Sequence, residues 1–305
     1  MPAFQPLFRN PHLQTIAGHF WTRSDECARF PIERRWFQTD PGVQVLLESQ
    51  RPAAECAGEI VLLHGMEGSG DSGYMRGLAG SALLAGLAAH RLQTRAIYHG
   101  GLTADLLAVL RQLRTEGRPP AFLVGFSLGG NVALKLAGEL GDAAAGLMRG
   151  VAAVSTPLDL AACARRIAQP ENRLYQRRFV RRMRARLRAE GLDRKRNFAH
   201  LNSVMAIDDA ITAPSFGFSG AAEYYRTQSA VRYLDAIRVP VLLIQAKDDT
   251  FVPFEIFESE AVRRNAAIEL LATEHGGHLG FLGRKPHRFW AEEIIVEWME
   301  LIANR

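Results

Sequence analysis

A short glycine-rich turn, Gly125-Phe126-Ser127-Leu128-Gly129-Gly130, is the feature that most constrains the fold of this chain. It directly follows an apolar run at residues 121–124 and opens a helical stretch at 132–140. A sharp turn from a strand into a helix strains its central residue and requires small neighbours, which the glycines supply. Such a turn presents a reactive hydroxyl, so Ser127 is the candidate nucleophile. An ordinary serine in a flexible turn is the alternative, which the coincidence of strand, turn and helix disfavours.

Short runs rich in valine, isoleucine and leucine recur along the chain, at residues 60–63, 121–124, 151–154, 241–244 and 268–271. Segments of helical length separate several of them, which is typical of a mostly parallel sheet buried on both faces. The expected fold class is therefore α/β, with helices on both faces of the sheet.

The first strands are expected to form the antiparallel edge of this sheet. Residues 32–38 and 43–49 flank Thr39-Asp40-Pro41-Gly42, which is a turn-forming tetrad. Two extended segments separated by such a turn predict a hairpin.

The length of 305 residues suits one α/β domain with an insertion better than two separate domains. Three widely spaced cysteines, Cys27, Cys56 and Cys163, indicate neither a disulfide framework nor a zinc site, so a reducing cytoplasm is the expected location. The first residues predict no cleaved signal peptide, because a basic start followed by an apolar run is missing. The Ala/Gly/Leu-rich stretch at 78–89 is shorter than the ~20 residues of a membrane span and is expected to be a buried helix.

A serine hydroxyl needs a histidine base, and the histidine needs a carboxylate that fixes its tautomer and stabilises its cation. The acid is expected between the serine and the histidine in the chain. The run at 241–244 ends in a turn that contains Asp248 and Asp249. Asp249 is the preferred acid and Asp248 its rival; a turn acid that only caps the next helix is the alternative.

The candidate base lies in the glycine-flanked loop after residues 268–271. This loop contains His275 and His278, and it can deliver an imidazole to the edge of the sheet. His278 is the preferred base, with His275 as the competitor, because a loop histidine is often only a solvated polar residue.

Acyl transfer also requires two backbone donors for the developing oxyanion. One is expected to be the amide of Leu128, and the other should come from the turn after residues 60–63. His64-Gly65-Met66-Glu67-Gly68 supplies that turn, and Met66 is the expected donor. Tight packing of the turn is the alternative role for His64 and Gly65.

A nearby segment, Gly68-Ser69-Gly70-Asp71-Ser72-Gly73, matches the pattern of a dinucleotide-binding turn. The preceding strand ends too early, however, and no acidic residue occurs from 74 to 104, where a ribose-binding acid should lie. The sequence therefore predicts no bound NAD.

The regular alternation of strands stops between residues 157 and 238, which we interpret as a lid inserted into a core formed by residues 1–156 and 239–305. Residues 173–196 carry a net charge of +9 and leave −4 for the remainder. Tyr175, Phe179, Met183 and Leu187 form an apolar stripe that predicts an amphipathic helix. We interpret its basic face as solvated; attraction to anionic substrates or peripheral contact with a membrane is the alternative. Nucleic-acid binding is not expected, because no known module accompanies the charge.

Several segments together resemble the YheT-like and ABHD-type branch of the AB hydrolase superfamily, over residues 10–282. They are Asn10-Pro11-His12-Leu13-Gln14-Thr15, His64-Gly65-Met66-Glu67-Gly68-Ser69, Tyr98-His99-Gly100-Gly101, Gly125-Phe126-Ser127-Leu128-Gly129-Gly130-Asn131, Ile211-Thr212-Ala213-Pro214 and the loop at 273–281. The resemblance implies an α/β-hydrolase fold and hydrolysis of carboxylic esters, often of medium-chain acyl or lipid esters. It also assigns the nucleophile, acid and base to Ser127, Asp249 and His278.

The sequence departs from this family between His90 and Tyr98, where Arg95-Ala96-Ile97 replaces a longer loop. This loop is expected near the mouth of the site, so the pocket should differ in shape from those of relatives.

The first functional hypothesis is an esterase that forms an acyl-enzyme on Ser127 and acts on small-molecule ester or lipid substrates, without a cofactor or a metal. An acyltransferase that passes the same acyl group to an alcohol is the second hypothesis. A ligand-binding module without catalysis is the third.

Overall fold

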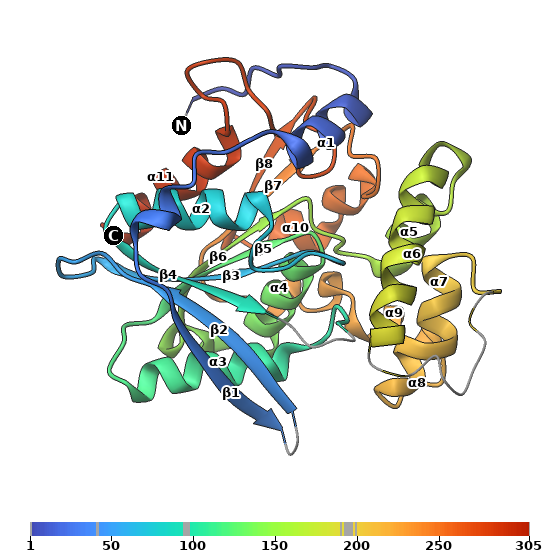
Figure 1. Cartoon of the computed structure of the whole chain (residues 1–305), viewed down its shortest axis with the longest axis horizontal. Coiled ribbons are helices and arrows are strands. Elements are labelled where there is room, and N and C mark those ends of the chain that lie inside the picture. The colour runs from blue at the N-terminus through green and yellow to red at the C-terminus, as the bar shows by residue number, and fades with distance from the viewer. Residues whose placement is uncertain are drawn as a thin grey trace.

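An eight-stranded sheet lies at the centre of the computed structural model, which describes residues 2–40, 43–93, 98–189, 191, 198 and 200–304 (Figure 1). The strands are β1 (Glu33–Asp40), β2 (Val43–Gln50), β3 (Gly58–Leu63), β4 (Leu87–Gln93), β5 (Ala121–Phe126), β6 (Met148–Val154), β7 (Val241–Ala246) and β8 (Ile268–Thr273). Their order across the sheet is β1-β2-β4-β3-β5-β6-β7-β8. The pairs β1/β2 and β2/β4 are antiparallel, and all other neighbours are parallel. The predicted α/β class, the edge hairpin and the five predicted strands are confirmed.

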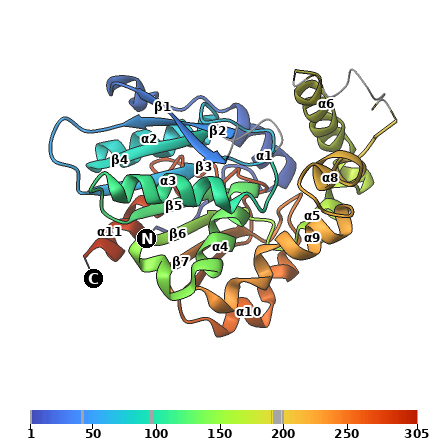
Figure 2. The same cartoon turned by 90° about the horizontal axis from the view of Figure 1, so that it is seen from below.

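Helices cover both faces of the sheet (Figures 1 and 2). One face carries α2 (Gly73–Leu84) and α11 (Trp290–Ala303), and the other carries α3 (Thr103–Thr115), α4 (Leu128–Leu140) and α10 (Glu260–Arg264). Side chains of a strand alternate between faces, so Ile60 and Leu62 of β3 join the core under α2 and α11, whereas Val61 and Leu63 join the core under α3 and α4. Burial on both faces explains why the central strands are continuous apolar runs.

The segment between β6 and β7 is helical and gathers at one end of the sheet (Figure 2). It contains α5 (Leu160–Ile167), α6 (Arg173–Ala189), α7 (Val204–Ile207), α8 (Ala213–Ser215) and α9 (Ala221–Gln228), and its described residues form no strand. The predicted amphipathic helix is confirmed as α6.

The remaining helical elements are short or terminal. They are α1 (Pro11–Phe20), the π-helical turn η5 (Asp208–Thr212) and the 3-10 turns η1 (Glu26–Arg29), η2 (Gly141–Gly146), η3 (Pro170–Asn172), η6 (Ala230–Arg232), η7 (Leu234–Ala236) and η8 (Phe254–Glu258). In the described part of the chain, every helix is too short or too polar to cross a bilayer. Cys27, Cys56 and Cys163 are all free thiols, in agreement with the sequence.

The prediction of one buried helix at residues 78–89 is wrong in its second half. Helix α2 ends at Leu84, Gly86 turns the chain with a φ of 82°, and β4 begins at Leu87. A positive φ favours glycine, so the turn is placed where a side chain would be strained. The alanines and leucines of β4 gave no strand signal, because its polar residues interrupt the apolar run. The strand lies between β2 and β3, and these polar side chains are paired within the sheet.

A buried polar chain joins β2, β3 and β4. His90 of β4 lies 2.8 Å from the hydroxyl of Ser49 through Nδ1 and 2.6 Å from a carboxylate oxygen of Glu59 through Nε2. Arg51 donates two hydrogen bonds to the same carboxylate, at 3.0 and 3.1 Å. Ser49, Glu59 and His90 are all buried, so each polar group is satisfied by protein and not by water.

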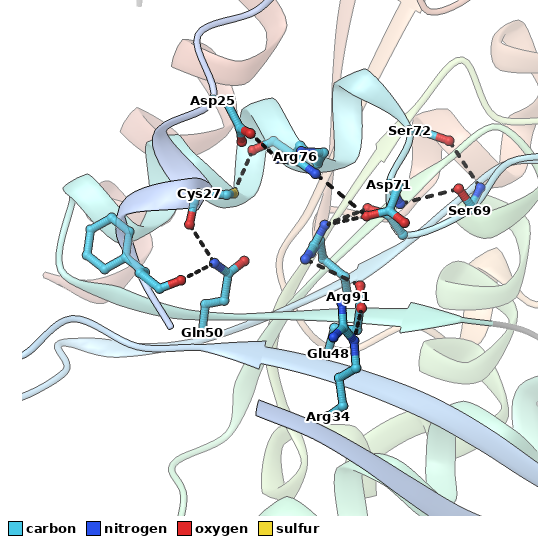
Figure 3. Close-up of polar contacts among 12 residues, drawn as sticks. Asp25, Cys27, Arg34, Glu48, Gln50, Ser69, Asp71, Ser72, Arg76 and Arg91 are labelled. Atoms are coloured by element: carbon cyan, nitrogen blue, oxygen red, sulfur yellow. Dashed lines mark hydrogen bonds and ion pairs between the residues drawn. The ribbon is translucent and has the colours of Figure 1, made fainter. Parts of the chain in front are cut away.

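The side chain of Arg91 binds the glycine-rich turn after β3. The guanidinium of Arg91, which is 1% exposed, donates to the carbonyl of Gly70 at 3.0 Å and lies 3.4 Å from Asp71 and 3.3 Å from Glu48 (Figure 3). Arg76 of α2 pairs with Asp25 beside this cluster. The turn that resembles a dinucleotide site in sequence is therefore held by its own arginine.

We expect Glu59→Gln to lower the free energy of unfolding by about 3 kcal/mol, because one partner of a buried ionic cluster is removed and His90 and Arg51 remain. Urea denaturation of the variant and wild type measures this difference. Glu55→Gln, at an exposed residue before the same strand, is the matched control and should change stability little. Equal stability of the two variants would contradict the role of Glu59.

The effect should also depend on pH. Burial favours the neutral acid, but hydrogen bonds from His90 and Arg51 outweigh it and hold the pKa of Glu59 below its ordinary value. A lowered pKa stabilises the fold above the ordinary pKa, and this stabilisation is lost as pH falls through the lowered one. The stability difference between wild type and Glu59→Gln should therefore shrink on acidification.

Candidate active site

Ser127 lies in a strained turn between β5 and α4. Its φ of 50° and ψ of −119° are unusual for a residue with a side chain, and such strain persists only where the surrounding structure enforces it. A Cβ at Gly125 would overlap the backbone of Gly129 and Gly130, and a Cβ at Gly129 would lie 2.5 Å from the carbonyl oxygen of Leu63. The glycines of the motif therefore let the turn close on itself and pack against β3.

His278 lies in the loop after β8 and faces Ser127. Its Nε2 is 3.0 Å from the Ser127 hydroxyl oxygen, and its Nδ1 is 3.0 and 3.1 Å from the two carboxylate oxygens of Asp249. The imidazole packs against the ring of Phe251, with the ring centroids 4.6 Å apart. The structure thus brings the three residues into one hydrogen-bonded chain, which we call the Ser127–His278–Asp249 chain.

Asp249 is buried in the turn after β7 and is held by three protein donors. Its Oδ1 accepts from the amides of Phe251 and Val252, at 2.8 and 3.0 Å. Its Oδ2 accepts from the side chain of Gln245 at 3.2 Å. Donors of this kind stabilise a carboxylate and fix its direction, so the acid can orient the imidazole of His278.

The two rival residues pair with each other instead. Asp248 lies 3.1 Å from Nδ1 of His275 and also accepts a hydrogen bond of 2.9 Å from the amide of Gly277. Both side chains are more exposed than those of Asp249 and His278. Asp248 and His275 therefore brace the loop that carries His278, and neither contacts Ser127.

Helix α1 holds the same loop from the other side. The amide of His278 donates to the hydroxyl of Thr15 at 2.9 Å, and the fully buried side chain of Gln14 donates to the carbonyl of Leu282 at 3.1 Å. Gly277 has a φ of 57°, and a Cβ there would lie 2.6 Å from the hydroxyl of Thr15. In the sequence, Gln14 and Thr15 stand out only as part of a family motif. No local pattern indicates that they hold a loop so distant in the chain.

Ser127 and His278 open into a mostly apolar cavity of about 100 Å³ under the inserted helices. Its apolar lining comes from the core and the insertion: Met66, Tyr98, Leu128, Pro157, Leu160, Cys163, Ala164, Ile167, Phe179, Met183, Val204, Tyr224, Phe251 and Val252. A cavity with apolar walls and few polar groups is typical of a small-molecule site. This one suits the apolar part of a substrate whose reacting carbon lies at Ser127.

Met66 and Leu128 line the same cavity. Leu128 is the first residue of α4, and Met66 follows Gly65, where a Cβ would lie 3.0 Å from Cβ of Ser127. Within the described part of the chain, neither amide donates to another protein group. Two such amides beside a nucleophile are available to a developing oxyanion.

His64 precedes these amides and remains part of the turn. Its Nδ1 lies 2.8 Å from the carbonyl oxygen of Gly65, and its ring packs against Tyr98. Burial lowers the pKa of His64 to about 4, so the ring is neutral near neutral pH. This geometry agrees with the packing role that the sequence left open for His64.

Glu67 connects the turn to helix α6. It has a φ of 58°, is buried, and lies 3.5 Å from Arg186 and 4.0 Å from Arg182. Burial raises the pKa of Glu67, and the two arginines oppose this shift. The position of α6 and the position of the turn that carries Met66 are therefore coupled through one carboxylate.

Asp208 is a buried carboxyl group in the wall of the cavity. The hydroxyl of Tyr225 donates to it at 2.6 Å. Burial raises its pKa to about 6, although hydrogen bonds from Tyr225 and Thr212 oppose the shift. Asp208 begins a π-helical turn, a geometry that is frequent at functional sites. Sequence reasoning missed this residue, because an isolated aspartate in a helical segment gives no signal.

A second cavity of about 180 Å³ lies on the other side of His278. It is lined by α1, α6 and the loops of the site: Thr15, Ile16, Gly18, His19, Phe20, Tyr74, Tyr175, Arg178, Phe179, Phe251, His278 and Leu279. His278, Phe179 and Phe251 line both cavities. His278 therefore lies at the boundary between two cavities, whereas Ser127 lines only the first. The shortened connection at Arg95-Ala96-Ile97, which the sequence places near this site, lies outside the described residues.

Comparison with known proteins agrees with this geometry. The family model "Alpha/beta hydrolase family" matches residues 60–292. The chain is 34% identical to "Putative esterase YheT" of Escherichia coli (strain K12), over 96% of this chain and 91% of that protein. It is 26% identical to the "Monoacylglycerol lipase" of Saccharomyces cerevisiae over 79% of this chain, and to "Phospholipase ABHD3" of Mus musculus over 82%. These alignments cover 59% and 63% of those two longer proteins.

Solved structures share the fold at low sequence identity. The esterase Pf2001 of Pyrococcus furiosus superposes with a TM-score of 0.63 at 18% identity, over 92% of this chain and 94% of that chain. Est1E of Butyrivibrio proteoclasticus superposes with a TM-score of 0.59 at 14% identity, over 89% of this chain and 99% of that chain. The family match, the relationship to YheT and the predicted resemblance agree: the chain belongs to the alpha/beta hydrolase family, in its YheT-like branch.

Proposed function

We propose that this protein is a serine hydrolase that cleaves carboxylic esters through an acyl-enzyme on Ser127. The observation that carries the proposal is the Ser127–His278–Asp249 chain at the wall of an apolar cavity, beside the amides of Met66 and Leu128. Relatives named as an esterase and as lipases support ester hydrolysis.

The geometry supports a two-step reaction. The Ser127 hydroxyl attacks the ester carbonyl carbon while Nε2 of His278 takes its proton, and Asp249 stabilises the imidazolium. The amides of Met66 and Leu128 donate to the oxyanion of the tetrahedral intermediate. As the intermediate collapses, the alcohol leaves with the proton from His278. A water molecule, deprotonated by His278, then attacks the acyl-enzyme, and the carboxylic acid is released as Ser127 regains its proton.

The two cavities suggest how the ester is oriented. The apolar cavity of about 100 Å³ is smaller than the pockets of drug-sized ligands, which begin at roughly 300 Å³, so it holds only part of such a molecule. It would receive the acyl group, while the alcohol portion would extend past His278 into the second cavity. In this arrangement both halves of a lipid or other acyl ester contact apolar walls.

Residues 157–238 would act as a lid over a core of residues 1–156 and 239–305. Helices α5 and α6 supply cavity walls, including Leu160, Phe179 and Met183. Glu67 ties α6 to the turn that carries Met66. Movement of α6 would therefore change both the size of the cavity and the setting of the oxyanion donor.

Acyl transfer to an alcohol is a second candidate function. The chain is 26% identical to "Medium-chain fatty acid ethyl ester synthase/esterase 2" of Saccharomyces cerevisiae over 78% of this chain and 61% of that protein. An apolar cavity beneath a lid limits the access of water, which favours an alcohol acceptor over hydrolysis.

We expect His278→Ala to lower kcat for p-nitrophenyl esters by about 10³-fold or more, because the general base of a triad is lost. His275→Ala is the matched control on the same loop: it removes a contact that braces the loop but leaves His278 and Ser127 in place, so it should lose far less activity than His278→Ala. Circular dichroism verifies that both variants are folded. Equal rates for wild type and His278→Ala would overturn the assignment.

The same prediction has a covalent readout that does not need the natural substrate. A fluorophosphonate probe should label the wild type and should fail to label Ser127→Ala. A folded wild type that the probe leaves unlabelled would favour a ligand-binding module without catalysis.

We expect the KM of wild type for an ester with an apolar acyl chain to increase by roughly tenfold as pH rises through about 6. Asp208 is protonated below this pH and ionised above it, and a carboxylate in the cavity wall disfavours an apolar group. Asp208→Asn keeps an acceptor for Tyr225 but cannot ionise, so its KM should lack this rise. Effects of pH that are common to both proteins cancel in the ratio of their KM values. If the ratio of the KM of wild type to that of Asp208→Asn does not vary with pH, Asp208 does not line the site of the acyl group.

Product analysis separates hydrolysis from transfer. With an acyl ester and added ethanol, we expect free acid to be the main product if water enters readily, and the ethyl ester to accumulate if the lid excludes water. Chromatographic quantification of both products, with Ser127→Ala as the blank, measures the partition. Ethyl ester as the main product would replace the hydrolase assignment by that of an acyltransferase.

A further inference from the structure

Helix α1 exposes its apolar residues and buries its small and polar ones. Gln14 and Gly18 are buried against the histidine loop, where a Cβ at Gly18 would lie 2.7 Å from Cα of Gly280. Leu13, Ile16 and Phe20 form a stripe three and four residues apart on the outer face, and Leu13 and Phe20 are 52% and 68% exposed. We call these three residues and the exposed Trp21 that follows the α1 patch. A helix that only closed the core would show the opposite arrangement.

Helix α6 contacts α1 through side chains, and both helices lie toward the same side of the molecule in Figure 2. The His12 ring stacks on that of Tyr175, with Nδ1 3.2 Å from the Tyr175 hydroxyl, and the guanidinium of Arg178 lies 2.9 Å from Nε2 of His19. These contacts fix the two helices at the same end of the molecule.

The sequence of α6 is strongly basic. Its seventeen residues include eight arginines and no aspartate or glutamate. Arg173, Arg177 and Arg181 are exposed and four residues apart, so they share one face. Among the described residues, no acidic side chain pairs with any of these three. Leu174, which is also exposed, adjoins them. We call Arg173, Leu174, Arg177 and Arg181 the α6 face.

We propose that the α1 patch and the α6 face together dock the protein onto a lipid bilayer that contains anionic headgroups. Leucine, isoleucine, phenylalanine and tryptophan side chains enter the boundary between headgroups and acyl chains, and arginines beside them pair with lipid phosphates. A second copy of the chain fits this surface poorly, because a symmetric contact would bring the α6 arginines of both copies together. A nucleic acid would use the arginines and leave the α1 patch exposed.

The α1 patch also borders the candidate active site. Ile16 and Phe20 of the α1 patch line the second cavity, which His278 and Leu279 also line. A lipid surface in contact with α1 would therefore lie at the entrance of the space proposed for the alcohol portion of the substrate. The placement of the alcohol portion rests on the proposed function, whereas the docking itself does not.

The experiment is cosedimentation of the full chain with vesicles of phosphatidylcholine alone and with vesicles that also contain phosphatidylglycerol. We expect the wild type to bind the anionic vesicles at least about tenfold more tightly, and added salt to weaken this binding. Leu13→Asp should abolish binding, because it places a charge where an apolar group enters the bilayer. The double variant Arg173→Glu and Arg177→Glu should do the same by removing the attraction to phosphates.

Matched controls exist on other helices. Leu84 on α2 and Leu301 on α11 are 57% and 52% exposed, and the C-terminal end of α11 lies across the sheet from α6 (Figure 1). Leu84→Asp and Leu301→Asp should bind vesicles as the wild type does. The proposal would be overturned by any of three results. The control variants could lose vesicle binding as Leu13→Asp does, the wild type could fail to bind vesicles, or it could bind both vesicle types equally.

Two further readouts separate this proposal from its rivals. Light scattering that reveals a wild-type dimer, converted to a monomer by Leu13→Asp, would mean that a second copy covers the patch and would overturn membrane docking. Hydrolysis of a water-soluble short-chain ester by Leu13→Asp should equal that of the wild type, because Leu13 lines neither cavity. Vesicle binding without any esterase activity would sustain the docking surface and refute the proposed function alone.

Discussion

The position of His278 depends on hydrogen bonds from three distant parts of the chain. Asp249 orients the ring, Ser127 faces its other nitrogen, and Thr15 of α1 accepts from its backbone amide. The loop itself contains residues with positive φ, among them Gly277 and Leu279, so it would not adopt this shape alone. The N-terminal helix is therefore a structural support of the site, although it lies more than half the chain length before it.

Residue types alone do not distinguish the proposed active site from a structural cluster in this protein. Ser49, His90 and Glu59 form a hydrogen-bonded chain with the same order of residue types as Ser127, His278 and Asp249, although the two ring nitrogens of the histidine are exchanged. The first chain is buried among β2, β3 and β4, and Arg51 fixes its carboxylate. The second ends at a strained serine beside a cavity and two amides. The two chains differ in their access to a cavity and in the backbone strain at the serine, and not in the kinds of groups that form the hydrogen bonds.

Sequence reasoning succeeded where the determinants are local. The turn around Ser127 and the turn before Asp249 follow apolar strands directly, so neighbouring residues specify them. It failed at β4, whose strand character comes from pairing with β2 and β3. It also missed Thr15 and Asp208, whose roles depend on contacts with elements far away in the chain. Spacing left the choice between the two aspartates open; the pairing of Asp248 with His275 gives the physical reason for the family assignment.

The apolar outer face of α1 and its support of the histidine loop are two sides of one constraint. Close approach of the helix to the loop requires Gly18 and the compact contacts of Gln14, so bulky side chains are excluded from the inner face. This explains why the inner face is small and polar, but it does not explain why the outer face carries leucine, isoleucine and phenylalanine, since lysine or glutamate would serve equally well in water. Exposed apolar residues in a contiguous patch indicate a binding surface. The same helix that fixes His278 on its inner side thus offers, on its outer side, a surface suited to lipid.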